Sequence, residues 1–143
     1  MRTLYMNEVQ VKRTLDRLAH EIIERNRGVE KLVVIGILTT GATLARRLVE
    51  RINAIEKSAI QSIELDVTAF RDDQPYQLAE TSLPDLTDKA VLLVDDVLFT
   101  GRTARAALDA VVRSGRPASI QLLALIDRGH REYPIQPDYV GRI

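Results

Sequence analysis

The chain has 143 residues, enough for one domain with its own core, and no cysteine, which excludes disulfides and thiolate metal sites. Its 20 basic and 20 acidic residues cancel, so the overall charge gives no reason to expect non-specific binding to nucleic acid or membranes. Since the apolar runs are too short to span a bilayer and cysteine is absent, we expect a single cytoplasmic domain over residues 1–143.

Hydrophobic periodicity divides the chain into alternating strands and helices. In chain order the predicted elements are a helix over 8–25, a strand over 31–38, a helix over 44–52, a half-buried strand over 63–69, a strand over 90–94, a helix over 104–112 and a strand over 120–126. This alternation predicts an α/β fold with a mostly parallel sheet and helices on both of its faces.

Ligands of such sheets bind beyond the carboxyl ends of the strands. That rule selects three loops, at residues 39–41, 95–103 and 127–131. A fourth segment, 71–89, has two prolines, many charges and no sustained period. Long loops within a compact domain are uncommon, so this segment is either an exposed connection or a mobile lid over the site.

The most informative run covers residues 91–103, where a buried strand ends in Asp95 and Asp96 and small and hydroxyl residues then lead into a helix. Thr100, Gly101 and Thr103 offer amides and hydroxyls at a helix N-terminus, where the dipole favours an anion. Carboxylates are strong acceptors for the two adjacent hydroxyls of a ribose. The order of residues therefore suits a ribose with a 5-phosphate.

Two simpler interpretations remain open for this run. A helix capped by Thr100 or Thr103 needs no ligand, and an acid pair also occurs in solvated turns and Mg²⁺ sites. Motifs of the form G-x-x-x-x-G-K-[ST] and G-x-G-x-x-G are absent from the sequence, which argues against a P-loop NTPase and against a dinucleotide-binding site.

The run resembles the phosphoribosyl-pyrophosphate motif of the type I phosphoribosyltransferases. More narrowly, the chain resembles the pyrimidine operon attenuation regulators that are also uracil phosphoribosyltransferases. The likeness extends from Met6 to Ile143 through several motifs in the same order: residues 19–26, 70–73, 115–117, 127–132, 134–135 and 138–141.

The resemblance implies the substrates phosphoribosyl pyrophosphate and uracil, the product uridine monophosphate, and Mg²⁺ that arrives with the pyrophosphate rather than on direct protein ligands. It also implies a homodimer or homotetramer, with Asp95, Asp96 and Arg128 as catalytic residues. The substrate-binding residues that it implies are Thr39, Thr40, Gly41, Arg71, Asp95, Asp96, Val97, Leu98, Phe99, Thr100, Gly101, Arg102, Thr103, Asp127 and Arg128.

The chain departs from the family pattern at the pyrophosphate loop, which usually reads Thr-Arg-Gly and here reads Thr39-Thr40-Gly41. The loop after Asp73 is shorter, and the family normally continues beyond the position of Ile143 with a further strand. The intact run from Asp95 to Thr103 favours an enzyme. The missing arginine favours the alternative, a non-enzymatic, nucleotide-sensing regulator that binds RNA.

The family also implies a basic surface for pyrimidine-operon leader RNA. The residues that would form it are Arg17, His20, Arg25, His130 and Arg131. Because Asp16 and Glu21 flank the helical members of this set, we expect RNA binding to be weak or absent.

Overall fold

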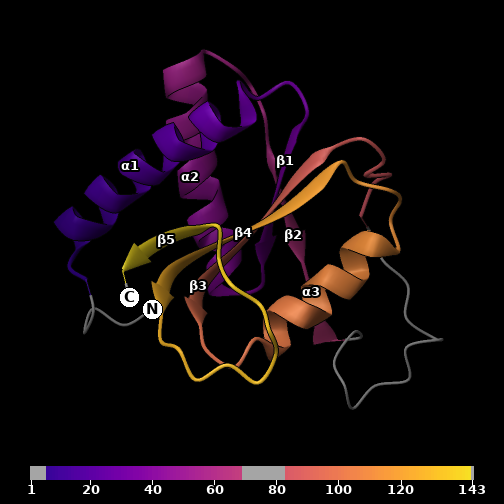
Figure 1. Cartoon of the computed structure of the whole chain (residues 1–143). Helices are drawn as coiled ribbons and strands as arrows, with labels where there is room; N and C mark the ends of the chain where they lie inside the picture. The colour runs from indigo at the N-terminus through magenta and orange to yellow at the C-terminus, as the bar shows by residue number, and fades with distance from the viewer. Residues whose placement is uncertain (1–5, 69–82, 143) are drawn as a thin grey trace.

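The computed structural model describes residues 6–68 and 83–142. Its elements are α1 (Glu8–Asn26), β1 (Leu32–Ile37), α2 (Thr40–Glu56), β2 (Ser62–Leu65), β3 (Ala90–Leu98), α3 (Arg102–Val112), β4 (Ser119–Asp127) and β5 (Tyr139–Arg142). The strands form one parallel sheet in the order β2-β1-β3-β4-β5, so β3 is central (Figure 1). Within these residues, no helix has the length and apolar character needed to cross a membrane.

The sheet separates two hydrophobic cores. Helices α1 and α2 cover one face and α3 covers the other (Figure 1). Leu92 and Val94 of β3 contribute to the core beneath α1 and α2, whereas Val91 and Leu93 pack on the α3 side, as the alternation of side chains along a strand requires. The predicted fold class, a parallel α/β sheet with helices on both faces, is therefore confirmed.

Helix α1 begins at a capping box. The Gln10 N–H donates to Asn7 Oδ1 and the Asn7 N–H donates to Gln10 Oε1, both at 2.9 Å. Each bond satisfies a backbone donor that has no partner within the helix. The cap fixes the start of α1 next to Met6, which is buried, and so places the first turn of this helix near the carboxyl end of the sheet.

Two predicted strands differ from the observed ones by more than two residues in length. Strand β2 ends at Leu65, because Asp66 Oδ1 accepts the Thr68 N–H at 3.0 Å and turns the chain; Val67 is nevertheless buried. Strand β3 continues past Val94 to Leu98, since its pairing with β4 extends to that residue. Asp95 and Asp96 therefore belong to the end of the strand rather than to the loop after it.

The segment predicted as a connection or lid lies largely outside the described residues. Its last part, from residue 83, is anchored: Leu86 is fully buried and its N–H donates to the Ser114 carbonyl at 2.8 Å. Leu86 therefore anchors residues 83–89, although most of the other side chains in this part are exposed. Leu86 stands between the polar residues Asp85 and Thr87, so no periodicity in the sequence could have shown its burial.

Strand β5 was not among the predicted elements. Tyr139 attaches it to the rest of the fold: its hydroxyl donates to Gln121 Oε1 of β4 at 2.6 Å, and Gln121 Nε2 donates to Asn26 Oδ1 of α1 at 3.0 Å. Gln121 is only 7% exposed, so these hydrogen bonds satisfy polar groups that would be costly to bury alone. The network joins α1, β4 and β5.

Candidate functional site

The site is built around a close approach between α2 and β3. Pairing of β1 with β3 stops at Val94, which leaves the edge of β3 beyond that residue facing the first turn of α2. Gly41 lies in this turn, and a Cβ atom on it would come within 2.5 Å of the Val94 carbonyl oxygen and 3.4 Å of Asp95 Oδ1. Only glycine permits this contact, which brings the segment 39–41 against the two aspartates. The Leu38–Thr39 peptide bond before it is cis.

Asp95 is the most perturbed acid of the site. Burial raises the pKa of its carboxyl group from 3.8 to about 7, helped by the negative charge of Asp96 and by a hydrogen bond with the Asp96 side chain, and opposed by the Asp96 N–H, which donates to Asp95 Oδ1 at 2.9 Å. Near neutral pH this carboxyl group is therefore only partly ionised. A ligand that supplies hydroxyl donors or a cation would favour the ionised form, so ligand binding would release a proton.

The loop after β3 forms a helix N-terminus open to an anion. Gly101 has a φ of 94°, a conformation that favours glycine, and α3 begins at Arg102. Thr100 Oγ1 accepts the Arg102 N–H at 3.2 Å, while the N–H groups of a first helical turn have no partner within the helix. The turn therefore offers backbone donors and a positive dipole end for a phosphate.

The loop after β4 is tied to this turn by Arg131. The Arg131 side chain is 12% exposed; it forms a 2.8 Å ion pair with Asp127 and donates to the Phe99 carbonyl at 3.0 Å and the Ile135 carbonyl at 2.6 Å. Its hydrogen bond is the main cause that lowers the pKa of Asp127. Glu132 adds an ion pair of 2.7 Å to Arg102. These contacts bring the two predicted loops together.

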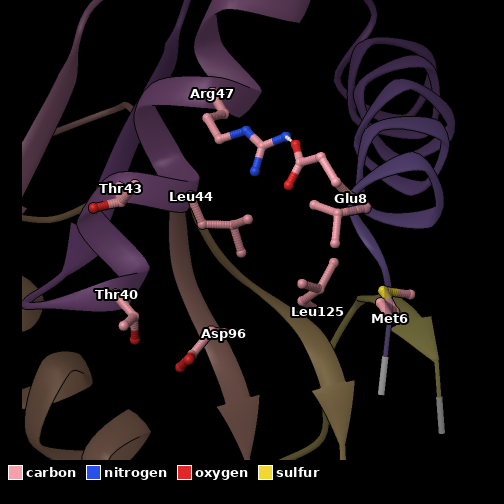
Figure 2. A pocket seen from close by; sticks show the side chains of 9 residues that line it. Met6, Glu8, Thr40, Thr43, Leu44, Arg47, Asp96 and Leu125 are labelled. Carbon is pink, nitrogen blue, oxygen red and sulfur yellow. Dashed lines mark hydrogen bonds and ion pairs between the residues drawn. The ribbon is translucent and has the colours of Figure 1, made fainter. Parts of the chain in front are cut away.

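A cavity of about 320 Å³ opens beside Asp96, between α1, α2 and the sheet (Figure 2). Its residues are Met6, Glu8, Val11, Thr40, Thr43, Leu44, Arg47, Asp96 and Leu125. Figure 2 shows Thr40 and Asp96 near one another at one end and the Arg47–Glu8 ion pair at the other. Met6, Glu8 and Arg47 could not be predicted as neighbours, because they lie outside any motif and meet only in the fold.

The structure brings most of the predicted site residues to one edge of the sheet. Thr40 and Gly41 meet Asp95 and Asp96 across the approach of α2 to β3, and residues 99–103 contact the loop at 127–132. Leu98 is buried in the α3-side core, so its side chain serves packing. Arg71 lies outside the described residues.

The predicted RNA-binding residues fall into two separate groups. Arg17 and Arg25 lie on α1 beside β5, where Arg17 pairs with Glu21 at 2.8 Å and Arg25 pairs with Asp138 at 3.2 Å; His20 is exposed on the same helix. His130 and Arg131 lie on the loop after β4. The Arg131 guanidinium is enclosed by Asp127 and backbone carbonyls, so in this fold it holds the loop together.

Within residues 6–68 and 83–142, no three His, Asp or Glu side chains gather as a metal site. Asp95 and Asp96 still provide adjacent carboxylate oxygens, the donors that Mg²⁺ prefers, and Mg²⁺ usually keeps waters or substrate oxygens as its other ligands. The two aspartates therefore fit a Mg²⁺ ion that is shared with a bound phosphate compound.

Comparison with known proteins identifies the class. The model of the phosphoribosyl transferase domain matches residues 5–142, nearly the whole chain, so the chain belongs to this family. Its parallel sheet with helices on both faces agrees with this assignment.

The sequence relatives narrow this to the PyrR members of the family. The chain is 54% identical to the bifunctional protein PyrR of Brevibacillus brevis over 147 residues, which covers 99% of this chain and 82% of that protein. It is 52% identical to the bifunctional protein PyrR of Geobacter sulfurreducens, with 98% and 82% covered. Identity to the pyrimidine operon regulatory protein of Lactococcus lactis is also 52%, with 96% and 80% covered.

Solved structures agree on the fold. A hypoxanthine-guanine phosphoribosyltransferase of Bacillus anthracis superposes with a TM-score of 0.78 at 23% identity, covering 95% of this chain and 78% of that one. A hypoxanthine phosphoribosyltransferase of Trypanosoma cruzi gives 0.77 at 21% identity, with 94% and 77% covered. At such identities the likeness shows the fold alone.

The raised pKa of Asp95 predicts a stability change with pH. Below about pH 4 this carboxyl group is protonated in both the folded and the unfolded chain; between about 4 and 7 only the unfolded chain ionises, so stability falls as pH rises through this range. The variant Asp95→Asn lacks this penalty. We expect it to be more stable than the parent at pH 8, by on the order of 2 kcal/mol, with the difference shrinking towards pH 4.

Urea unfolding at several pH values measures this difference. Asp88→Asn is the matched control, because Asp88 is exposed and has a φ of 64°, which asparagine tolerates. A difference for Asp95→Asn that does not change between pH 4 and 8 would show that this carboxyl group ionises normally.

Proposed function

We propose that the chain is a uracil phosphoribosyltransferase, which converts uracil and phosphoribosyl pyrophosphate into uridine monophosphate and pyrophosphate. The main supporting observation is the contact of Gly41 with the end of β3. This contact brings the segment 39–41 against Asp95 and Asp96. The chain then leads from these two residues to the N-terminus of α3, which we assign to the phosphate. The names of the PyrR relatives, which describe them as bifunctional and as regulators of a pyrimidine operon, agree with a pyrimidine substrate.

Each part of the site has a role in this reaction. Asp95 and Asp96 accept hydrogen bonds from the two ribose hydroxyls, and the N–H groups at the start of α3 hold the 5-phosphate. Thr39, Thr40 and Gly41 face the pyrophosphate. N1 of uracil attacks C1 of the ribose as the bond from C1 to the pyrophosphate oxygen breaks, and the proton of N1 passes to the departing pyrophosphate. The carboxylates stabilise the positive charge that develops on the ribose.

When Mg²⁺ is bound, it neutralises part of the negative charge of the pyrophosphate. We infer that it would enter with phosphoribosyl pyrophosphate rather than on direct protein ligands, and that Asp95 and Asp96 would help to hold it through bound water. We further propose a cytoplasmic location, in keeping with a phosphorylated intracellular substrate and a chain without cysteine. A homodimer or homotetramer is also part of this proposal.

The pyrophosphate loop gives the sharpest test, because Thr40 stands where the family usually has arginine. A charged hydrogen bond contributes about 1.5–3 kcal/mol, so Thr40→Arg should raise kcat/KM for phosphoribosyl pyrophosphate roughly tenfold to a hundredfold. Steady-state assays with Mg²⁺ and each free base in turn measure the transfer. Thr43→Arg adds the same charge one helical turn further on and serves as control.

The expected base preference in these assays is uracil. Transfer to hypoxanthine or guanine in preference to uracil would contradict the substrate assignment. If neither the parent nor the Thr40→Arg variant transferred phosphoribosyl groups to any base, the proposed enzymatic function would be contradicted. The alternative, a nucleotide-sensing regulator, would then be favoured.

A second function is favoured by the relatives named as pyrimidine operon regulators. We propose that the chain binds pyrimidine-operon leader RNA through the exposed stripe formed by Arg17, His20 and Arg25 on α1. The geometry limits its strength, because Glu21 and Asp138 already pair with the two arginines and a phosphate must compete with them.

We therefore expect weak binding that improves when one acid is removed. In a gel-shift titration with a leader hairpin and uridine monophosphate, Glu21→Gln should bind more tightly than the parent by about threefold to tenfold, with a steeper dependence on salt. Glu24→Gln, an exposed acid on the same helix without an ion pair among the described contacts, is the control. If both variants bound the hairpin with equal affinity, the proposal that the α1 stripe is the RNA-binding surface would be rejected.

A further inference from the structure

Phe99 is a large aromatic residue that the core does not use. It follows the buried end of β3 directly, yet its side chain is 41% exposed. Its position is nevertheless fixed through the backbone: the Phe99 carbonyl accepts Arg131 Nη1 at 3.0 Å, and the Leu98 carbonyl before it accepts the Arg128 N–H at 2.8 Å. Contact between an exposed apolar ring and water is unfavourable, and a flat ligand that covered the ring would remove that contact.

Two other flat groups lie next to this ring. The guanidinium carbon of Arg128 is 4.8 Å from the ring centroid of Phe99, and the His130 ring meets it in a T-shaped contact with the centroids 5.7 Å apart. No carboxylate in the described part of the chain pairs with the Arg128 side chain, which lies over the ring with its N–H donors available to a ligand. The guanidinium lies over one face of the Phe99 ring, so a planar ring with carbonyl oxygens can stack on the opposite face.

The place of Phe99 in the site follows from the chemistry of the ribose. Asp95 and Asp96, which we assign to the ribose hydroxyls, lie before it, and the phosphate-binding turn follows it. In a displacement at C1 the incoming base approaches from the side opposite to the leaving pyrophosphate. The segment 39–41 lies on the β1 side of β3, so the base approaches from the β4 side, where Phe99 and Arg128 meet.

We propose that Phe99 is the stacking surface for the pyrimidine base and that the Arg128 guanidinium completes this surface. The inference rests on the proposed function and adds to it the residue that distinguishes a nucleotide from ribose 5-phosphate. Stacking on a π face tolerates different bases, so the Phe99 surface supplies affinity for a planar ring, while the choice among bases falls to hydrogen-bonding groups around it.

Calorimetric titration of uridine monophosphate and of ribose 5-phosphate tests this directly. Because Phe99→Ala removes the aromatic surface beneath the base, we expect it to lower the affinity for uridine monophosphate about tenfold. The affinity for ribose 5-phosphate should stay within twofold of the parent value. Leu108→Ala, which removes a similarly exposed apolar side chain from α3, should change neither affinity. The assignment would be overturned if Phe99→Ala lowered the affinity for both ligands equally, or changed neither affinity.

A second variant provides a readout that a purely structural role would not change. The chain contains no tryptophan, so Phe99→Trp introduces a single fluorescent reporter at the proposed surface. Uridine monophosphate should quench its fluorescence by stacking, whereas saturating ribose 5-phosphate should leave it nearly unchanged. If ribose 5-phosphate and uridine monophosphate both fail to bind the parent, the proposed function itself fails; if both bind and the tryptophan does not respond to the base, only the Phe99 assignment fails.

Discussion

The arrangement of the site depends on how closely α2 lies against the centre of the sheet. Small residues make this possible at two levels. A Cβ atom on Gly36 of β1 would come within 2.5 Å of Ala42 Cα and 2.7 Å of Ala45 Cβ, and one on Gly41 would meet the Val94 carbonyl. With these positions filled by larger side chains, the first turn of α2 would move away from β3. The segment 39–41 would then separate from Asp95, and the two halves of the site would no longer share a ligand.

The same approach accounts for the unusual state of Asp95. The first turn of α2 covers this carboxyl group, and Asp96 adds a second negative charge, so its pKa rises to about 7. A buried and partly protonated acid reduces the stability of the empty protein. A ligand with two adjacent hydroxyls, or a Mg²⁺ ion brought by a phosphate, satisfies both carboxylates. The cost in stability and the capacity to bind therefore have one origin, as is common at functional sites.

Much of the fold could be predicted from local pattern. The core faces of α1 and α2 follow the helical period, and the buried strands are continuous apolar runs, so the parallel sheet and the position of the acid pair at its carboxyl edge followed directly. The end of β3 was misjudged, because charged residues such as Asp95 look like a loop when the paired strand β4 is unknown. Strand β5 was missed for a similar reason: its burial depends on Gln121 and Asn26, which are remote in sequence.

Side-chain partnerships were the least predictable part of the site. Arg131 has the composition of a nucleic-acid contact, yet in the fold it joins Asp127 to the carbonyls of Phe99 and Ile135. The cavity formed with Arg47 and Glu8 and the pairing of Phe99 with Arg128 likewise arise from residues far apart in the chain. Motifs identify the groups that we propose to bind ribose and phosphate, whereas the surfaces around them come from tertiary packing.

The central claim is that one ribose 5-phosphate compound bridges the end of β3 and the start of α3. A crystal structure of the chain with uridine monophosphate tests it most directly. The account predicts phosphate oxygens within hydrogen-bonding distance of the N–H groups at 101–103, and both ribose hydroxyls on the carboxylates of Asp95 and Asp96. A nucleotide bound elsewhere, with these two carboxylates left without contact to it, would contradict the account.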